Sequence, residues 1–200
     1  MKTLATSVAL GLALMTPTVS TAANNYTVDQ AHSTAAFSVK HMMVTNVRGI
    51  MSNITGSIAI DDKHIDKSTV NVEIDVNTID TRNEKRDGHL KSPDFFDTAK
   101  FPKITFKSTK VKKKGKGKLA VSGDLTIRGI TKSVTLDVEG PTPEMKSPWG
   151  QTVRGVHAST TINRKEWGLT WNKALEAGGV LVGDEVKISL DIELHKQAPG

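Results

Sequence analysis

From residue 26 onward, apolar and polar side chains alternate along one segment of the chain after another. The clearest case is the segment in which Val70, Val72, Ile74 and Val76 are separated by single polar residues. A strict period of two predicts a β-strand with one dry face and one wet face. The same pattern predicts seven further strands, at 37–41, 50–60, 104–107, 119–127, 134–138, 156–162 and 186–194.

Short turns join most of these segments, which is typical of antiparallel neighbours in a barrel or a sandwich. An open sheet would expose two edge strands to aggregation, and closure removes them, so we favour a closed barrel. A polar helix is predicted over 82–91, where Pro93 stops it, and a second short helical or irregular stretch near 173–178. The predicted fold is therefore mainly all-β, with eight antiparallel strands and one or two short helices.

The N-terminus has the features of a secretory signal peptide, with Lys2, an apolar region over 4–15 and small residues before Ala22. The apolar region is too short for a mature transmembrane anchor. We expect cleavage after Ala22, with Ala23 as the alternative site, which divides the chain into a signal peptide over 1–22 and one domain over 23–200. The short basic and apolar regions are typical of bacteria and favour a periplasmic location.

Several kinds of chemistry are excluded or unsupported. The chain contains no cysteine, which excludes disulfides, thiolate metal sites and a cysteine nucleophile. Its six histidines show none of the HxxxH, HxH or HExxH spacings, so no metal site is predicted. GxSxG, P-loop and GxGxxG motifs are also absent, so we predict no catalytic residue and no cofactor.

The dry faces of the strands allow two interpretations. Most of their side chains are Val, Ile and Leu, and few aromatic residues join them. They can pack against each other as an ordinary core, which is what such faces usually do. Around a wide barrel they can instead leave the centre unfilled, as an apolar tunnel for a chain-like lipid. Periodicity alone does not decide between a core and a tunnel.

Longer motifs support the tunnel. They are HSxxxFSVKH at 32–41, TRNEKRDGHLKSPDFFDTAKFP at 81–102, LTIRGITKSVTL at 125–136 and INRKEWG at 162–168. Together they resemble the YceI-like family of bacterial polyisoprenoid-binding proteins, from Tyr26 to about His195. The resemblance implies an extended, lipocalin-like antiparallel barrel with a helix near one end. It also implies an internal hydrophobic pore for a long isoprenoid or another amphiphilic, fatty-acid-like lipid, and a homodimer.

The parity of the strands indicates which residues would form the wall of such a pore. The expected wall residues are Phe37, Val39, Val72, Ile74, Ile104, Phe106, Leu125, Ile127, Leu136, Ile188 and Leu190. His41 continues the face of Phe37 and Val39, so it is a candidate partner for a lipid head group, with a purely structural role as the alternative. Trp167 and Trp171 would share one face of a strand, lining the pore or its rim or filling core. Phe95 and Phe96 would plug one barrel end or gate it.

A cluster of lysines raises the question of which partners the protein contacts. Six lysines between Lys110 and Lys118 surround two glycines, which is typical of a solvated hairpin tip. The alternative is transient contact with an anionic membrane surface. Nucleic-acid binding is not expected, because the patch lacks interleaved aromatic residues and the chain is exported.

The sequence therefore predicts a periplasmic protein that sequesters or transports a polyisoprenoid or similar lipid and is not an enzyme. Two alternatives stay open: an enzyme acting on a lipid-like substrate in the same pore, and a ligand-free, stress-related interaction barrel.

Overall fold

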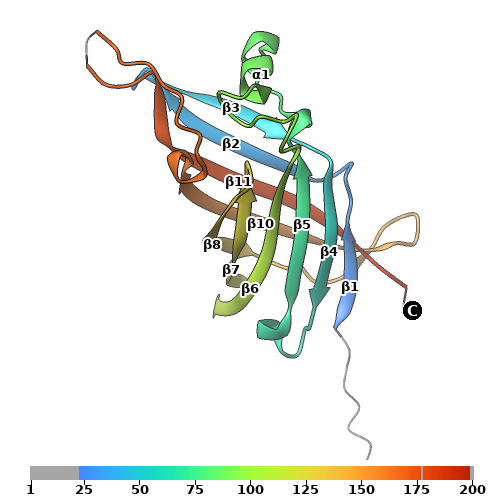
Figure 1. Cartoon of the computed structure of the whole chain (residues 1–200). Helices are drawn as coiled ribbons and strands as arrows, with labels where there is room; N and C mark the ends of the chain where they lie inside the picture. Colours follow the sequence, from blue (N-terminus) through green and yellow to red (C-terminus); the bar gives the residue numbers. More distant parts are fainter. Residues whose placement is uncertain (1–22, 177, 199–200) are drawn as a thin grey trace, which may run out of the picture.

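Antiparallel strands account for most of the computed structural model, which describes residues 23–176 and 178–198 (Figure 1). The predicted signal peptide at 1–22 lies outside the described residues. Within the described residues, no helix is both long enough and apolar enough to cross a membrane. The strands are β1 (Asn24–Val28), β2 (Thr34–His41), β3 (Thr45–Met51), β4 (Ile54–Ile60), β5 (Thr69–Asp75), β6 (Lys103–Gly115), β7 (Lys118–Ile127), β8 (Ile130–Glu139), β9 (Met145–Lys146), β10 (Thr152–Asn163) and β11 (Val182–Lys196).

The last strand, β11, closes the sheet on itself. On one side it pairs with β10 over the register Glu185 to His195. On its other side it pairs first with β2 and then, at its C-terminal end, with β1. From β1 the sheet continues through β4, β5, β6, β7 and β8 back to β10. This closed antiparallel arrangement confirms the predicted barrel.

The barrel has eight strands, but two of them are interrupted, so each of these two is divided into two shorter strands. We call each of the eight barrel strands a wall. β1 and β2 together form one wall, interrupted at 29–33, where five residues face only two residues of β11. β3 and β4 form the next wall, interrupted at Ser52 and Asn53, and Asn53 has a left-handed φ of 54°. β9 adds only a two-residue pairing at the end of β10.

The break in the second wall corrects the predicted strand at 50–60. That prediction placed Ile50 on the same dry face as Ile54, but Ile50 is 43% exposed and its neighbour Met51 is buried. Asn53 changes the parity of the strand because its backbone leaves the extended conformation. The dry face therefore passes from Met51 to Ile54.

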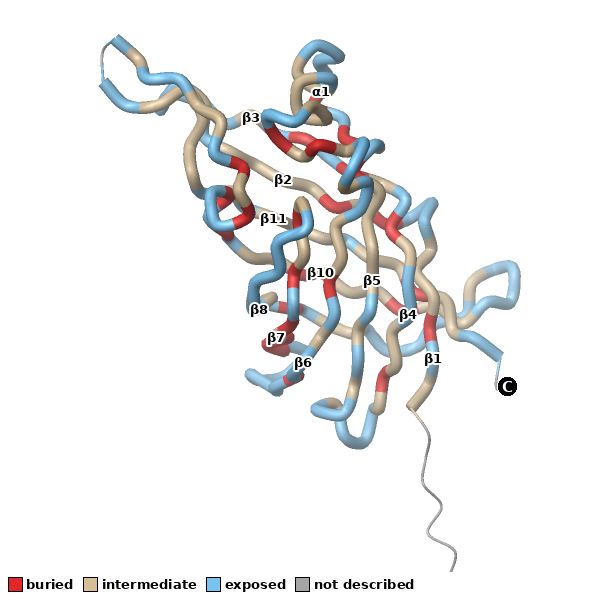
Figure 2. The backbone as a smooth tube through the Cα atoms, in the orientation of Figure 1, coloured by how far each residue is buried: buried red, intermediate tan, exposed pale blue. Residues whose placement is uncertain are grey.

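Helix α1 (Glu84–Lys91) begins two residues later than predicted and ends before Pro93 as expected. Asn83 caps it by accepting a hydrogen bond from the backbone N–H of Arg86. The helix contains no buried residue (Figure 2). Short 3₁₀ turns occur at η1 (Ile65–Lys67), η2 (Val76–Thr78) and η3 (Arg164–Trp167). Of the two alternatives predicted near 173–178, the described residues there form the irregular stretch and not the helix, apart from a bridge between Ala174 and Val180.

Candidate functional site

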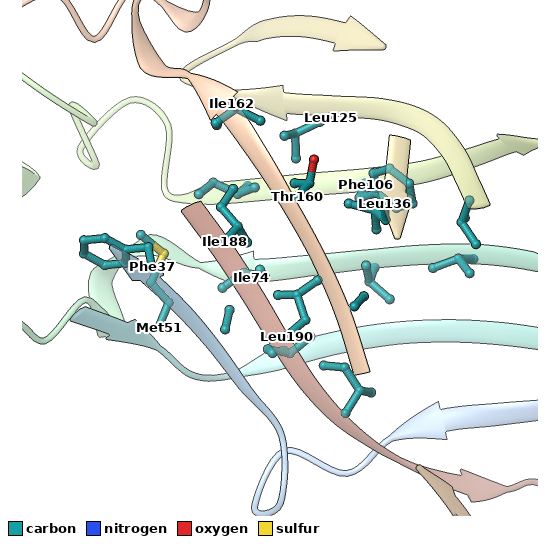
Figure 3. Close-up of a pocket in the computed structure, with 18 of the residues that line it drawn as sticks. Phe37, Met51, Ile74, Phe106, Leu125, Leu136, Thr160, Ile162, Ile188 and Leu190 are labelled. Carbon is teal, nitrogen blue, oxygen red and sulfur yellow. The ribbon is translucent and has the colours of Figure 1, made fainter. Parts of the chain in front are cut away.

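A cavity of about 270 Å³ lies inside the barrel, lined by the inward faces of its strands. Figure 3 shows side chains from several strands, including Phe37, Ile74, Leu136 and Ile188, surrounding a common space. An eight-stranded barrel of this kind can hold one small ligand when its inward side chains do not fill the centre. The volume is close to the lower end of the range for small-molecule sites, which begins at roughly 300 Å³.

Every one of the eleven wall residues predicted from strand parity lines this cavity. Their contact with a lipid stays a prediction, but their position is that of a pore wall. Parity also explains further lining residues that were not among the eleven predicted, because they lie on the same apolar strand faces. They include Ala35, Ile54, Leu119, Val121, Val138, Val156, Ala158, Ile162, Val186 and Ile192. Met51 and Val111 also line the cavity, but parity does not explain them, because the break at Asn53 and a register shift between Ser108 and Lys110 change the inward face of their strands.

The cavity surface offers almost no free polar group. Its polar lining residues are Ser68, Thr160 and Arg164. The Ser68 hydroxyl accepts a hydrogen bond from the Asp61 backbone N–H at 3.1 Å, and the Thr160 hydroxyl donates to the Thr135 carbonyl at 3.1 Å. Because these groups are already bonded to the protein, the cavity suits hydrocarbon and does not suit a buried charge.

Arg164 is a buried cation whose hydrogen bonds all go to main-chain carbonyls. The guanidinium donates to Gly183 at 2.8 Å, to Trp171 at 3.0 Å and also to Leu169 and Val182. Burial lowers the pKa of Arg164 from its ordinary value, and the nearby Asp184 carboxylate opposes that shift. The side chain thus ties the segment after η3 to the start of β11, at the end of the cavity.

Aromatic and aliphatic side chains close the barrel end beneath α1. Phe95 is buried and lines the cavity, together with Phe96 and with Leu90 of the helix. The backbone N–H of Phe96 donates to the Leu90 carbonyl at 3.0 Å, which holds the segment after the helix against it. The prediction that these two phenylalanines lie at a barrel end is therefore consistent with their position, and whether they plug or gate it stays a prediction.

A different group of residues closes the other end. Tyr26, Ile60 and Leu194 form a fully buried cluster there. The Tyr26 hydroxyl donates to Glu144 at 2.6 Å, and the Arg154 guanidinium lies 5.8 Å from the centre of the Tyr26 ring. Burial, reinforced by the Glu144 hydrogen bond, raises the pKa of Tyr26 to about 12. This end of the barrel is thus closed by a buried cluster whose one polar group, the Tyr26 hydroxyl, is hydrogen-bonded to Glu144.

Arg154 and Glu144 are held by ion pairs around this buried cluster. Arg154 donates to the Asp62 carboxylate at 2.8 Å and to the Thr142 carbonyl at 2.9 Å. The Lys196 ammonium lies 2.7 Å from Glu144 and, with the Tyr26 hydroxyl, holds the pKa of that carboxyl below its usual range. Glu144 therefore stays ionised and able to accept the Tyr26 hydrogen bond.

Three predicted site residues, His41, Trp167 and Trp171, are not among the residues that line the cavity. His41 is the last residue of β2, opposite Thr45 and opposite Val182, which does line the cavity. The expectation that Trp167 and Trp171 share one strand face is wrong. Trp167 ends η3, and Gly168 then adopts a left-handed φ of 72°, which turns the chain out of the sheet.

Both tryptophans support the barrel end instead of its wall. Trp167 is 1% exposed, and its indole N–H donates to the Leu125 carbonyl at 3.1 Å. Trp171 packs against His89 and Phe95, with ring centroids 4.7 Å and 5.3 Å apart. Local alternation could not reveal these positions, because the residues belong to a turn and an irregular segment.

The chain is similar to several known proteins. It matches the model of the YceI-like domain over residues 26–194. A UPF0312 protein of Staphylococcus aureus (strain N315) is 41% identical over 171 residues, which cover 84% of this chain and 96% of that relative. A UPF0312 protein of strain USA300 is 40% identical over the same shares.

Solved structures share the barrel. Burkholderia cenocepacia BcnA has a TM-score of 0.71 at 22% identity, covering 83% of this chain and 98% of that one. The Campylobacter jejuni YCEI protein has a TM-score of 0.67 at 26% identity, covering 80% and 90%. A polyisoprenoid binding domain from Saccharophagus degradans has a TM-score of 0.61 at 14% identity, covering 86% and 98%. Since the family model spans most of the chain, this protein belongs to the YceI-like domain family.

Proposed function

We propose that this protein binds a polyisoprenoid or a similar long-chain amphiphilic lipid and carries or sequesters it in the periplasm. The observation that carries the proposal is the apolar cavity, whose few polar lining groups are already bonded to the protein. Membership of the YceI-like family supports it, as does the likeness of the fold to a polyisoprenoid binding domain from Saccharophagus degradans. The tail of the lipid would lie in the cavity and its polar head outside the apolar lining.

The energetics favour reversible binding. Moving a hydrocarbon tail from water into the barrel would gain about 0.8 kcal/mol per CH₂ group. Such a lipid resides in a bilayer, however, where its tail is already removed from water. The hydrophobic free energy of the tail is therefore nearly the same in the bilayer and in the barrel, and ordering the flexible tail opposes binding. The lipid would therefore exchange between bilayer and barrel, as storage or transfer requires.

Lipid analysis of the protein from its own host tests this proposal. Native mass spectrometry of protein purified from the native periplasm should show a bound lipid, and solvent extraction should identify a long-chain amphiphile. In vitro, a hydrophobic fluorophore should enter the barrel and be displaced by an isoprenoid. Protein that carries no lipid and takes up no fluorophore would contradict the proposal, and would favour a packed interaction barrel.

Binding without catalysis is part of the proposal, because the family resembles a binding domain and not an enzyme. Ser68 and Thr160 are the hydroxyl side chains on the cavity wall, and both are hydrogen-bonded to main-chain groups. Incubation with prenyl phosphates should therefore return them unchanged. Turnover would identify an enzyme that acts on a lipid-like substrate in the same cavity.

Contact with an anionic membrane would bring the barrel to the bilayer from which it takes lipid or to which it delivers it. The lysine-rich hairpin between β6 and β7 is the proposed contact. Lys114 and Lys118 pair with Asp137 and Glu139 on β8, which reduces the charge available there. Charge reversal at Lys112, Lys113 and Lys116 should abolish binding to anionic vesicles, and unchanged binding would remove this contact. The periplasmic location and the homodimer also stay predictions, tested by cell fractionation and by sedimentation.

A further inference from the structure

Four titratable side chains meet on the outer wall of the barrel, at the interruption between β1 and β2. Asp29 and His32 belong to the five-residue segment that faces two residues of β11. Glu193 and His195 come from β11 itself. Nε2 of His195 lies 3.1 Å from Oδ2 of Asp29 and 3.2 Å from Oε1 of Glu193. Nδ1 of His32 lies 2.8 Å from the same Asp29 oxygen.

Strand geometry assembles this group from distant parts of the sequence. Glu193 and His195 alternate with Leu194, which is fully buried, so the two polar side chains share the opposite, outward face of β11. The Asp29 backbone N–H donates to the Glu193 carbonyl at 2.9 Å, which brings the carboxylate of Asp29 beside both residues. Histidine spacing could not predict the group, because pairing between the first and last strands creates it.

The charges of the group are not balanced by basic side chains. Among the described residues, the cationic partners within 4.0 Å of the Asp29 and Glu193 carboxylates are histidines, with no lysine or arginine. The side chain of Asp29 is only 14% exposed. The two carboxylates therefore have imidazoles as their cationic partners within 4.0 Å among the described residues.

The donor atoms also have a spacing that suits a metal. Zinc binds imidazole nitrogen and carboxylate oxygen at about 2.0–2.2 Å in tetrahedral geometry, which places neighbouring ligand atoms roughly 3.3 Å apart. The His195 nitrogen lies near that distance from both carboxylates. Donor atoms from Asp29, Glu193 and His195 all lie within 4.8 Å of one another. Small side-chain rotations would bring them around one ion.

We propose that Asp29, Glu193 and His195 bind one divalent transition-metal ion of the Zn²⁺ class on the outside of the barrel. Water completes the coordination, and the imidazole of His32 positions the carboxylate of Asp29 by hydrogen bonding. The site is separate from the cavity, because Ile192 and Leu190 of the same strand face inward and line it. The proposal does not depend on the lipid-binding function.

Cobalt provides the test, because Co²⁺ bound in a low-symmetry protein site has a visible absorption band that the aquo ion lacks. Titration of untagged mature protein should produce this band with one equivalent of Co²⁺, and Zn²⁺ should abolish it. Glu193→Gln and His195→Gln should each weaken binding by about tenfold or more. His32→Gln should keep the stoichiometry and weaken binding by about tenfold, the effect expected of an outer-shell partner.

His157 supplies the matched control. Its Nδ1 lies 2.8 Å from Oδ1 of Asp191, a distance equal to that of the His32–Asp29 pair, yet this pair is not part of the three-ligand group. His157→Gln should bind Co²⁺ like the wild type, and fluorophore uptake should be equal in all variants. Absence of the band in folded wild-type protein, or an equal loss in His157→Gln and His195→Gln, would overturn the proposal.

Discussion

The imidazole of His89 meets the indole of Trp171 edge to face, with ring centroids 4.7 Å apart and ring planes at 90°. The same imidazole packs edge-on against Phe95 at 5.0 Å and lies 2.8 Å from the Asp94 carboxylate. Helix α1 is therefore joined to the segment after η3 through an aromatic cluster. Of these aromatic residues, Phe95 also lines the cavity, so the cluster lies where a ligand would pass if this end opened.

The position of Phe95 and Phe96 leads to a prediction about exchange. Replacing both with alanine should release a bound hydrophobic fluorophore several-fold faster, because the side chains that close this end of the cavity are removed. Stopped-flow displacement by excess isoprenoid measures the rate. Phe101→Ala is the control, because Phe101 packs against Gly129 and is not a lining residue. Unchanged exchange together with lower stability would assign the pair to a structural plug.

The hollow itself can be tested by filling it. Ala158 is buried and lines the cavity, so Ala158→Phe should occupy space that a ligand needs and reduce fluorophore uptake at least tenfold. In a fully packed core such an enlargement costs about 1–3 kcal/mol, whereas in a hollow the cost should be smaller. Urea unfolding measures that difference.

Ala59→Phe is the matched control for this substitution. Ala59 lies on β4 between two cavity-lining residues, Ile58 and Ile60, and is not a lining residue itself. Its variant should bind the fluorophore like the wild type. Full uptake by Ala158→Phe would show that the ligand does not occupy this part of the barrel.

Tyr26 predicts how stability changes at alkaline pH. Burial, with the Glu144 hydrogen bond, raises its pKa from 10.0 to about 12 in the folded protein. The folded state therefore holds the phenolic proton more tightly than the unfolded state, so its contribution is complete below pH 10 and is lost as the pH rises through 12. The loss is on the order of 3 kcal/mol.

Tyrosinate absorbance reports on Tyr26 alone, because Tyr26 is the only tyrosine in the chain. Tyrosinate absorbance should titrate near pH 12 in folded protein and near pH 10 in urea. Between these values, the free energy of unfolding of Tyr26→Phe should fall less steeply than that of the wild type. Titration near pH 10 in the folded protein would show that the hydroxyl is solvated.

We expect replacement by alanine to have opposite effects on stability at two glycines. A Cβ at Gly49 would lie 2.5 Å from the ring of Phe37, a cavity-lining residue, so Gly49→Ala should destabilise the protein by about 1–3 kcal/mol and disturb uptake. A Cβ at Gly88 of α1 would meet nothing within 4 Å. Gly88→Ala should therefore stabilise the protein by about 0.5–1 kcal/mol. Thermal unfolding compares the two, and a tolerated Gly49→Ala would show that the Phe37 ring moves freely.

The sequence by itself determined most of the strands, their inward faces where no break or bulge intervenes, and the end of the main helix. It did not predict β1 (Asn24–Val28). Val72, Ile74, Ile188 and Leu190 line the cavity as parity predicted, because alternation along a strand is a local property that closure does not change. The cap at Asn83 and the stop before Pro93 are equally local. Where Asn53 breaks the strand, alternation failed, and Met51 replaced Ile50 on the inward face.

Only the tertiary structure decided whether the inward faces meet each other or surround a hollow. That outcome depends on how far apart closure of eight walls holds the opposite side chains, which no segment of sequence encodes alone. Tertiary structure also placed Trp171 against His89 and brought Asp29 of the first wall to His195 of the last. Contacts of this kind join residues far apart in the chain, so they exist only after the barrel has closed.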